Sequence, residues 1–135
     1  MSGIEVREVK SKQDKRTFLT LPWLVYKDDP LWVPPVLTER ARVIDPRYGQ
    51  FFQRGEADFF IAWQNGKPVG TICAAEDPPT NQSRGTRECV FGFFEYIQDY
   101  AVFEALVNQV SQWAQKRGLN ALFGPFNLDY EDSYG

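Results

Sequence analysis

Residues 88–127, ECVFGFFEYIQDYAVFEALVNQVSQWAQKRGLNALFGPFN, decide the fold. Residues 88–97 are rich in Phe and β-branched side chains and are mostly apolar on both alternating faces, which is typical of a central strand covered on both sides. Asp99 then supplies a helix N-cap, and apolar residues follow at helical spacing up to Gly118, which is suited to end a helix. Residues 121–127 resume as a strand. Strand, helix and strand in this order predict a right-handed parallel crossover.

A hairpin precedes this unit. Residues 58–63 and 68–75 are two strand-like runs joined by Asn65-Gly66. Asn-Gly is the preferred pair for a type I′ turn, because both turn positions require positive φ. The polar stretch at residues 76–87 contains Pro, Gly, Asn and Ser, and we expect a mobile loop there.

The N-terminal part reads as a short strand followed by helices. Ser11 is placed to cap a helix, with Asp14 returning the contact of a capping box. Pro22 should bend or end that helix, because proline lacks the amide donor, and residues 23–26 then continue as a second, offset piece. A further short helix is expected over residues 36–44.

The resulting order is β-α-α-β-β-β-α-β, an α/β (α+β) class with a mixed sheet. A length of 135 residues fits one domain, residues 1–135. A hydrophobic content of 43% against 24% charged residues predicts a packed core. The net charge of −3 is spread over interspersed acidic and basic residues, which argues against a nucleic-acid partner.

Several function classes are excluded or disfavoured. The chain has no His, which removes Ser-His and Cys-His pairs and histidine-based zinc sites. Its two Cys residues, Cys73 and Cys89, have no metal-type spacing, so they read as small buried apolar residues and no metal is expected. No apolar run is long enough to span a bilayer, and residues 1–10 show no signal region. We therefore expect a cytoplasmic protein without a membrane partner.

The element order resembles the first part of the GNAT superfamily of acyl-CoA-dependent N-acyltransferases, over most of residues 4–127. Four segments also resemble one GNAT-like branch of large bacterial proteins: residues 18–22 (FLTLP), 26–35 (YKDDPLWVPP), 91–95 (FGFFE) and 124–127 (GPFN). The resemblance implies a portion of an N-acyltransferase that uses acetyl-CoA or another acyl-CoA. By position, it implies that the cofactor is bound by Phe93, Phe94, Glu95, Gln98, Asp99 and Tyr100.

One departure from the family concerns the cofactor loop. GNAT enzymes hold the pyrophosphate with a loop of the form Arg/Gln-x-x-Gly-x-Gly/Ala, whose glycines let backbone amides approach the phosphates. Residues 97–102 contain no glycine, and Asp99 places a carboxylate where an anion would sit. Two readings stay open: an acyltransferase with a degenerate loop, or a non-catalytic GNAT-like module that binds a ligand or another protein.

Glu95 is the main catalytic candidate. The resemblance implies a strand carboxylate near the acyl group that accepts the amine proton. Simple alternation places Glu95 on one face with Cys89, Phe91 and Phe93, where the aromatic rings would desolvate it. The alternative is a carboxylate that reaches solvent or pairs with Lys or Arg.

Tyr96 is the second catalytic candidate, as a general acid toward the thiolate leaving group, and Tyr100 could take the same role. Each could instead be a core aromatic residue whose hydroxyl is hydrogen-bonded.

The last strand is the remaining open point. A GNAT fold continues after its fifth strand with a helix and two more strands, so we expect the domain to be truncated there. An uncovered strand at residues 121–127 exposes free backbone groups. Either a longer protein covers this strand, or the chain associates with itself through it.

Overall fold

A computed structural model of the chain describes residues 3–34, 37–125 and 128. The elements in chain order are β1 (Ile4–Glu8), α1 (Lys12–Val25), α2 (Leu37–Val43), the 3₁₀ helix η1 (Gln50–Gln53), β2 (Glu56–Gln64), β3 (Lys67–Glu76), α3 (Pro78–Arg84), β4 (Glu88–Tyr96), α4 (Tyr100–Lys116) and β5 (Ala121–Phe123). The five strands form one sheet in chain order. All neighbours are antiparallel except β4 and β5, which are parallel.

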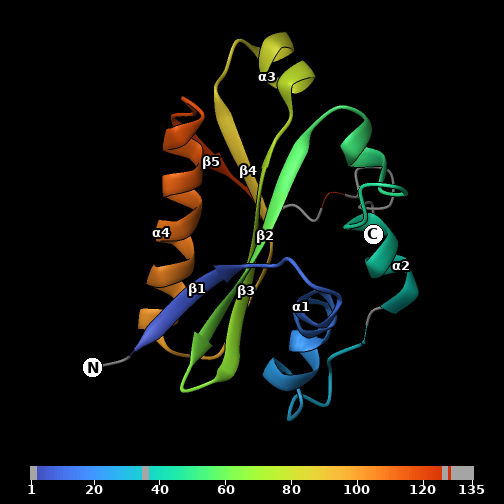
Figure 1. Cartoon of the computed structure of the whole chain (residues 1–135), viewed down its shortest axis with the longest axis vertical. Coiled ribbons are helices and arrows are strands. Elements are labelled where there is room, and N and C mark those ends of the chain that lie inside the picture. Colours follow the sequence, from blue (N-terminus) through green and yellow to red (C-terminus); the bar gives the residue numbers. More distant parts are fainter. Residues whose placement is uncertain (1–2, 35–36, 126–127, 129–135) are drawn as a thin grey trace.

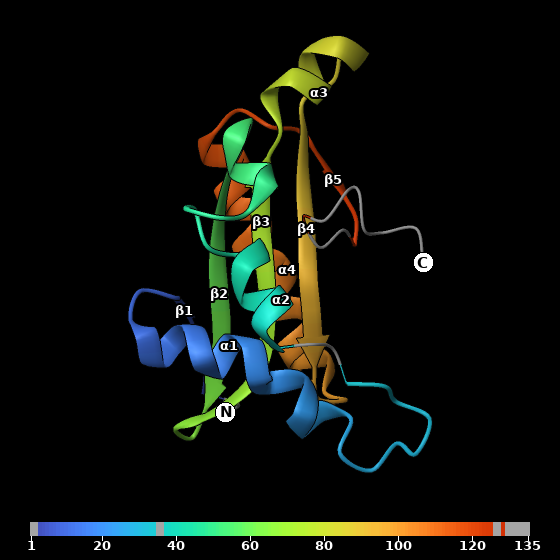
Figure 2. The same ribbon diagram turned by 90° about the vertical axis from the view of Figure 1, so that its right-hand side faces the viewer.

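Helices cover both faces of this sheet, so the molecule has three layers. Figure 1 shows α4 on one face and α1 with α2 on the other, and Figure 2 shows α1 and α2 in front of the sheet. One apolar cluster lies under α4 and includes Val102, Leu106 and Val110. A second cluster lies under α1 and includes Phe18 and Phe51. The predicted mixed α/β class is confirmed, and the strand order and main helices agree with the prediction.

The hairpin between β2 and β3 turns at Asn65 and Gly66, whose φ angles are 53° and 76°. Both positions are in the left-handed region, as a type I′ turn requires. The predicted hairpin is therefore confirmed.

Helix α1 agrees with the prediction at its start and differs from it at its end. The capping box is present: Ser11 Oγ accepts from the Asp14 amide at 3.0 Å, and Asp14 Oδ2 accepts from the Ser11 amide at 3.3 Å. Pro22, however, lies inside one helix that continues to Val25, so the expected second, offset piece was wrong. The buried side chains of Phe18 and Pro22 pack this part of the helix into the molecule, and such packing offsets the missing amide donor.

The segment at residues 76–87 is also more regular than predicted. It contains α3, which is capped by Asp77 through a 3.2 Å hydrogen bond from the Thr80 amide and ends at Gly85 with φ 68°. Asp77 is buried and forms an ion pair of 3.2 Å with Arg54. An N-cap followed directly by proline and ended by a left-handed glycine is a helix signal that the polar composition concealed.

Candidate active site at the carboxyl end of strand β4

A β-bulge in β4 determines which side chains reach the site. The pairing of β3 with β4 shifts register between Thr71 and Cys73. Opposite this shift, Phe93 has φ 48°, a left-handed conformation that a bulky residue adopts only when its surroundings hold it. The buried Thr71 hydroxyl holds it by donating a 2.7 Å hydrogen bond to the Phe93 carbonyl oxygen.

The bulge moves side chains to the opposite face relative to simple alternation. Cys89 and Phe91 pack in the cluster under α4, together with Phe94. Phe93 packs in the cluster under α1. The prediction that Cys89 and Phe91 share a face with Phe93 and Glu95 was therefore wrong, because it assumed an unbroken period of two.

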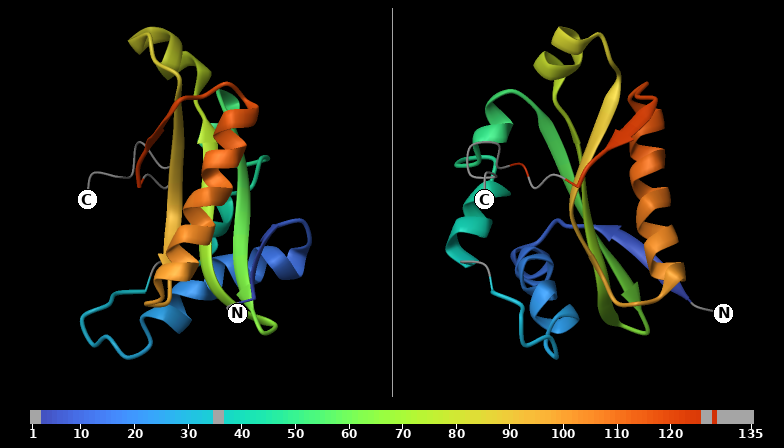
Figure 3. Two further views of the ribbon diagram at one scale, coloured as in Figure 1. Left: turned by 90° about the vertical axis from the view of Figure 1, so that its left-hand side faces the viewer. Right: turned by 180° about the vertical axis from the view of Figure 1, so that it is seen from behind.

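Strands β4 and β5 diverge before the bulge is reached. Their pairing extends only from Glu88 to Val90 on β4, and Figure 3 shows β5 leaving the sheet beyond that point. Gly124 lies against the Phe91 carbonyl, so closely that any side chain there would collide with it. Among the described residues, no strand covers the β5-facing edge of β4 after Val90. In the described part of the chain, the β4 backbone beyond Phe91 is therefore without a strand partner on this side, which is the kind of edge that a strand-like ligand can pair with.

A cavity of about 890 Å³ lies at the end of this edge. Two segments far apart in the sequence form it: the last turn of α1 with the turn that follows, and the end of β4 with the residues before α4. Its lining residues are Leu24, Val25, Tyr26, Asp28, Asp29, Pro30, Phe94, Glu95, Tyr96, Ile97 and Gln98. The lining combines polar and apolar surface in nearly equal parts, and carboxylates come from both segments.

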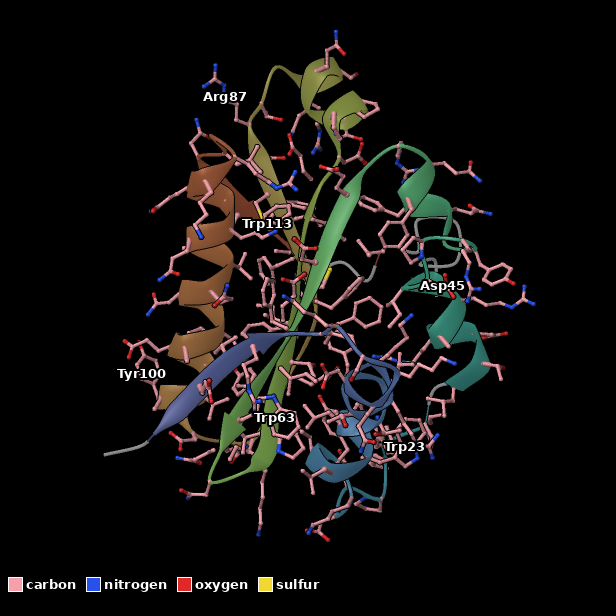
Figure 4. The ribbon with its side chains drawn as sticks, viewed as in Figure 1. Trp23, Asp45, Trp63, Arg87, Tyr100 and Trp113 are labelled. Carbon is pink, nitrogen blue, oxygen red and sulfur yellow. The ribbon has the colours of Figure 1, made fainter. Side chains whose placement is uncertain are left out.

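Glu95 is held by a tyrosine across the cavity. The Tyr26 hydroxyl donates a hydrogen bond of 2.6 Å to Glu95 Oε1. That bond, with burial and the negative charge of Glu95, raises the pKa of Tyr26 to about 12. Tyr26 is itself positioned by Trp32, whose ring stacks on it at 5.5 Å, and Trp32 meets Trp23 edge-on at 5.4 Å. Figure 4 labels Trp23 beside α1 on this side of the molecule. The candidate base therefore has a fixed partner that stays protonated at neutral pH.

The structure brings together some of the predicted cofactor residues and separates others. Phe94, Glu95 and Gln98 line the cavity, whereas Phe93 is buried under α1. Tyr100 is 72% exposed and stacks on Phe103 at 5.6 Å, outside the cavity lining.

Tyr96, the predicted general acid, lines the cavity and belongs to an aromatic cluster. Its ring lies 5.0 Å from that of Phe94 and 5.6 Å from that of Phe103. These contacts give the ring a packing role on the α4 side of the sheet, consistent with the alternative of a packed aromatic residue.

Asp99 occupies the N-terminus of α4. Its Oδ1 accepts a 2.9 Å hydrogen bond from the Ala101 amide, so a carboxylate already occupies this helix end. The residues here do not fit a diphosphate, because a second anion would be repelled and no glycine allows close approach.

Sequence reasoning did not assign Tyr26 or its neighbours to the site. Asp28 and Asp29 were not assigned to the site either, yet both line the cavity. A signal did exist, since Tyr26, Asp28, Asp29 and Trp32 lie in the YKDDPLWVPP segment that carried the family resemblance.

Other kinds of site receive no support from the described residues. Residues 3–34, 37–125 and 128 hold no group of three or more His, Cys, Asp or Glu that could bind a metal ion. None of their helices is long and apolar enough to cross a membrane. Cys73 and Cys89 are buried; burial raises the pKa of the Cys89 thiol to about 11 and that of Cys73 well above its usual value.

The layered sheet, the bulged β4 and its divergence from β5 define the GNAT acetyltransferase-like fold. A tandem GNAT protein from the clavulanic acid biosynthesis pathway matches with a TM-score of 0.68 at 17% identity, over 88% of this chain and 35% of that chain. A predicted acetyltransferase from Clostridium acetobutylicum, solved with acetyl-CoA, matches with a TM-score of 0.62 at 12% identity, over 98% and 90% of the two chains. An aminoglycoside acetyltransferase from a soil metagenome gives a TM-score of 0.59 at 12% identity, over 94% and 80% of the two chains.

Two curated bacterial proteins are similar in sequence. The "Bacterial ceramide synthase" of Caulobacter vibrioides is 32% identical over 99% of this chain and 35% of its own length. "Protein YghO" of Escherichia coli is 29% identical over 96% of this chain and 33% of its own length. The chain thus spans about a third of the length of these relatives. No protein-family model matches it.

Proposed function

We propose that this chain contributes the β4 side of the active site of an acyl-CoA-dependent N-acyltransferase, with Glu95 as general base. One observation carries the proposal: the Glu95 carboxylate, fixed by Tyr26 at 2.6 Å, lines a cavity at the point where β4 becomes free to pair with a ligand. A base beside a backbone edge that can align a thioester is the arrangement that acyl transfer to an amine needs.

The proposed step is a direct transfer. The amine nitrogen attacks the thioester carbonyl carbon, a C–N bond forms, and the C–S bond breaks to release a thiolate. Glu95 accepts the proton that the nitrogen loses, directly or through a water molecule. The products are an amide and a free thiol once the thiolate takes up a proton from solvent.

Tyr26 acts here as a positioning residue. With a pKa of about 12, its hydroxyl keeps its proton at neutral pH and is a poor proton donor to a thiolate. It orients one oxygen of Glu95, which leaves the other oxygen available to the amine.

The proposed acceptor is an amine on a long hydrocarbon chain. Leu24, Val25 and Ile97 give the cavity apolar walls, while Asp28 and Asp29 add negative charge that attracts an ammonium group, which releases one proton to solvent before the neutral amine attacks. The name of the Caulobacter relative, a ceramide synthase, supports the same class, since a ceramide is the amide of a fatty acid and a long-chain amino alcohol.

The proposed donor is a pantetheine thioester that is recognised through its amide-bearing arm. The free edge of β4 suits that arm, whereas Asp99 disfavours a diphosphate at the N-terminus of α4. The same observation at Asp99 favours a second candidate function, a GNAT-like module that binds a ligand without transferring an acyl group.

Product formation separates these two functions. The purified protein is incubated with palmitoyl-CoA and a long-chain amino alcohol, and the amide is quantified by mass spectrometry. The enzyme proposal predicts turnover that depends on both substrates. Ligand-dependent thermal stabilisation without any amide would support the binding module instead.

A further inference from the structure

A groove between α1 and α2 combines an apolar floor with a basic rim. It has a volume of about 290 Å³ and is lined by Lys12, Lys15, Arg16, Leu19, Thr20, Leu37, Thr38 and Ala41. The three cations come from the first two turns of α1. The net charge of the chain is −3, so this concentration of positive charge runs against the average of the sequence.

These cations are not explained by the stability of α1. A helix N-terminus carries partial positive charge, so cations there are unfavourable and anions favourable. The first turn holds one acidic residue, Asp14, which is already engaged in the capping box, and the last turn holds no basic residue. The placement of Lys12, Lys15 and Arg16 is therefore the reverse of what helix stability favours.

A second apolar feature lies on the same side of the sheet, in the strap formed by residues 26–34 between α1 and α2. Leu31 and Val33 in this strap are 87% and 82% exposed. The backbone between them is held in place by its neighbours. Trp32 packs against Tyr26 and Trp23, and Asp29 accepts a 2.9 Å hydrogen bond from the Leu31 amide. Figure 2 shows α1 and α2 in front of the sheet with α4 behind, and the strap projecting past the C-terminal end of α1 at the lower right.

We propose that this face, α1 and α2 with the strap, docks on the surface of an anionic lipid bilayer. The basic rim complements acidic head groups, the apolar floor accepts part of a lipid chain, and Leu31 and Val33 insert at the interface, where Trp side chains are also favoured. The absence of a long apolar run led to the expectation of no membrane partner, but that criterion concerns spanning, and surface docking needs no such run.

Acidic groups also lie near this face, and the exposed Asp28 and Asp29 of the strap oppose its attraction to anionic lipid. Asp28 and Asp29 line the cavity that contains Glu95, while Asp45 is paired with Arg47 at 2.9 Å. Glu39 and Lys27 are exposed and of opposite sign. Docking would bring the cavity mouth, beside the strap, to the level where a lipid amine lies; this last step rests on the proposed function, whereas the docking itself does not.

Vesicle binding tests the proposal without any enzymatic readout. The purified protein is sedimented with vesicles of phosphatidylcholine alone, and with vesicles of equal parts phosphatidylcholine and phosphatidylglycerol. We expect binding to the anionic vesicles only, weakened by added salt. Neutralising three cations in the variant K12Q/K15Q/R16Q should weaken binding on the order of 100-fold, at about fivefold for each charge.

Three controls keep the result interpretable. K67Q/R87Q/K116Q removes three exposed cations that lie outside the groove, and it should bind nearly as the unmodified protein does. Removing cations from the start of α1 should leave the melting temperature unchanged or raise it, which excludes unfolding as the cause of lost binding. Glu95→Gln should bind vesicles normally, so failure of the proposed chemistry would not affect this test.

The apolar contribution is tested with L31S/V33S, which should weaken binding on the order of tenfold. Equal binding of K12Q/K15Q/R16Q and the unmodified protein would overturn the proposal. It would also be overturned by equal binding to both kinds of vesicle, or by binding to an acidic protein partner with no binding to vesicles.

Discussion

The Tyr26 hydroxyl donates a hydrogen bond of 2.6 Å to Glu95 Oε1, and so joins the turn after α1 to strand β4 across 69 positions of sequence. The bond ties the strap to the sheet at the cavity and leaves Glu95 with one defined orientation. Because preorganisation of a base contributes directly to its effectiveness, this pair is the basis of the proposed function.

The first prediction concerns the titration of Tyr26. Its pKa is raised to about 12 chiefly by the hydrogen bond to Glu95, then by burial and the charge of Glu95. The difference in ultraviolet absorbance between the unmodified protein and Tyr26→Phe should therefore show one tyrosine that ionises near pH 12. In Glu95→Gln the same tyrosine should ionise closer to pH 10, its ordinary value.

The stability that this pair contributes follows from the same shift. Since the folded pKa lies above the unfolded one, the contribution is fully present below pH 10 and is lost as the pH rises through about 12. Urea unfolding of the unmodified protein and Tyr26→Phe should converge over that window. A constant difference across it would contradict the assignment of the hydrogen bond.

The second prediction concerns the β4 bulge. Thr71→Val removes the hydroxyl that holds the buried Phe93 carbonyl and should lower the free energy of unfolding by about 1–3 kcal/mol. Thr20→Val is the matched control, because the Thr20 hydroxyl bonds only within its own helix, and its loss should be nearly neutral. Urea denaturation measures both. A near-neutral Thr71→Val would mean that packing alone sets the bulge.

The third prediction concerns Asp99 and the donor. Asp99→Asn keeps the helix cap and removes the charge, so stability should be little changed. Use of acyl-CoA should improve by about fivefold in kcat/KM, because one repulsion of the diphosphate is relieved, whereas use of acyl-pantetheine should not change. If the unmodified protein uses acyl-CoA far better than acyl-pantetheine, a diphosphate site elsewhere is required.

The fourth prediction concerns the two thiols. Cys73 and Cys89 are buried, and burial holds the pKa of Cys89 at about 11 and that of Cys73 well above 9. Neither should react with a disulfide reagent at mildly alkaline pH in the folded protein, and both should react after unfolding in guanidinium. Rapid labelling of one thiol in the folded state would show that its surroundings open.

The parts of the fold that sequence reasoning predicted correctly are set by neighbouring residues. The turn at Asn65-Gly66 and the capping box of Ser11 and Asp14 depend on two to four positions, so local propensity is sufficient to identify them. Helix α3 had such a signal too, in Asp77 followed by proline, but the polar composition around it favoured a loop.

The candidate site was predicted only in part because long-range contacts build it. Glu95 was identified on its own, while its partner Tyr26 was not, since nothing local links positions 69 apart. The face assignment of Cys89 and Phe91 failed for a similar reason. The bulge depends on a hydrogen bond between Thr71 and Phe93, which lie 22 positions apart, and no period in β4 alone reveals it.

The central claim, that Glu95 is the base of an N-acyl transfer, is tested most directly by steady-state kinetics of Glu95→Gln beside Glu104→Gln. Glu104 is an exposed carboxylate on α4, so its neutralisation matches the charge change away from the cavity. We expect Glu95→Gln to lower kcat by about 10²–10⁴-fold, whereas Glu104→Gln should leave kcat unchanged. Equal turnover by Glu95→Gln and the unmodified protein would show that Glu95 is not the base.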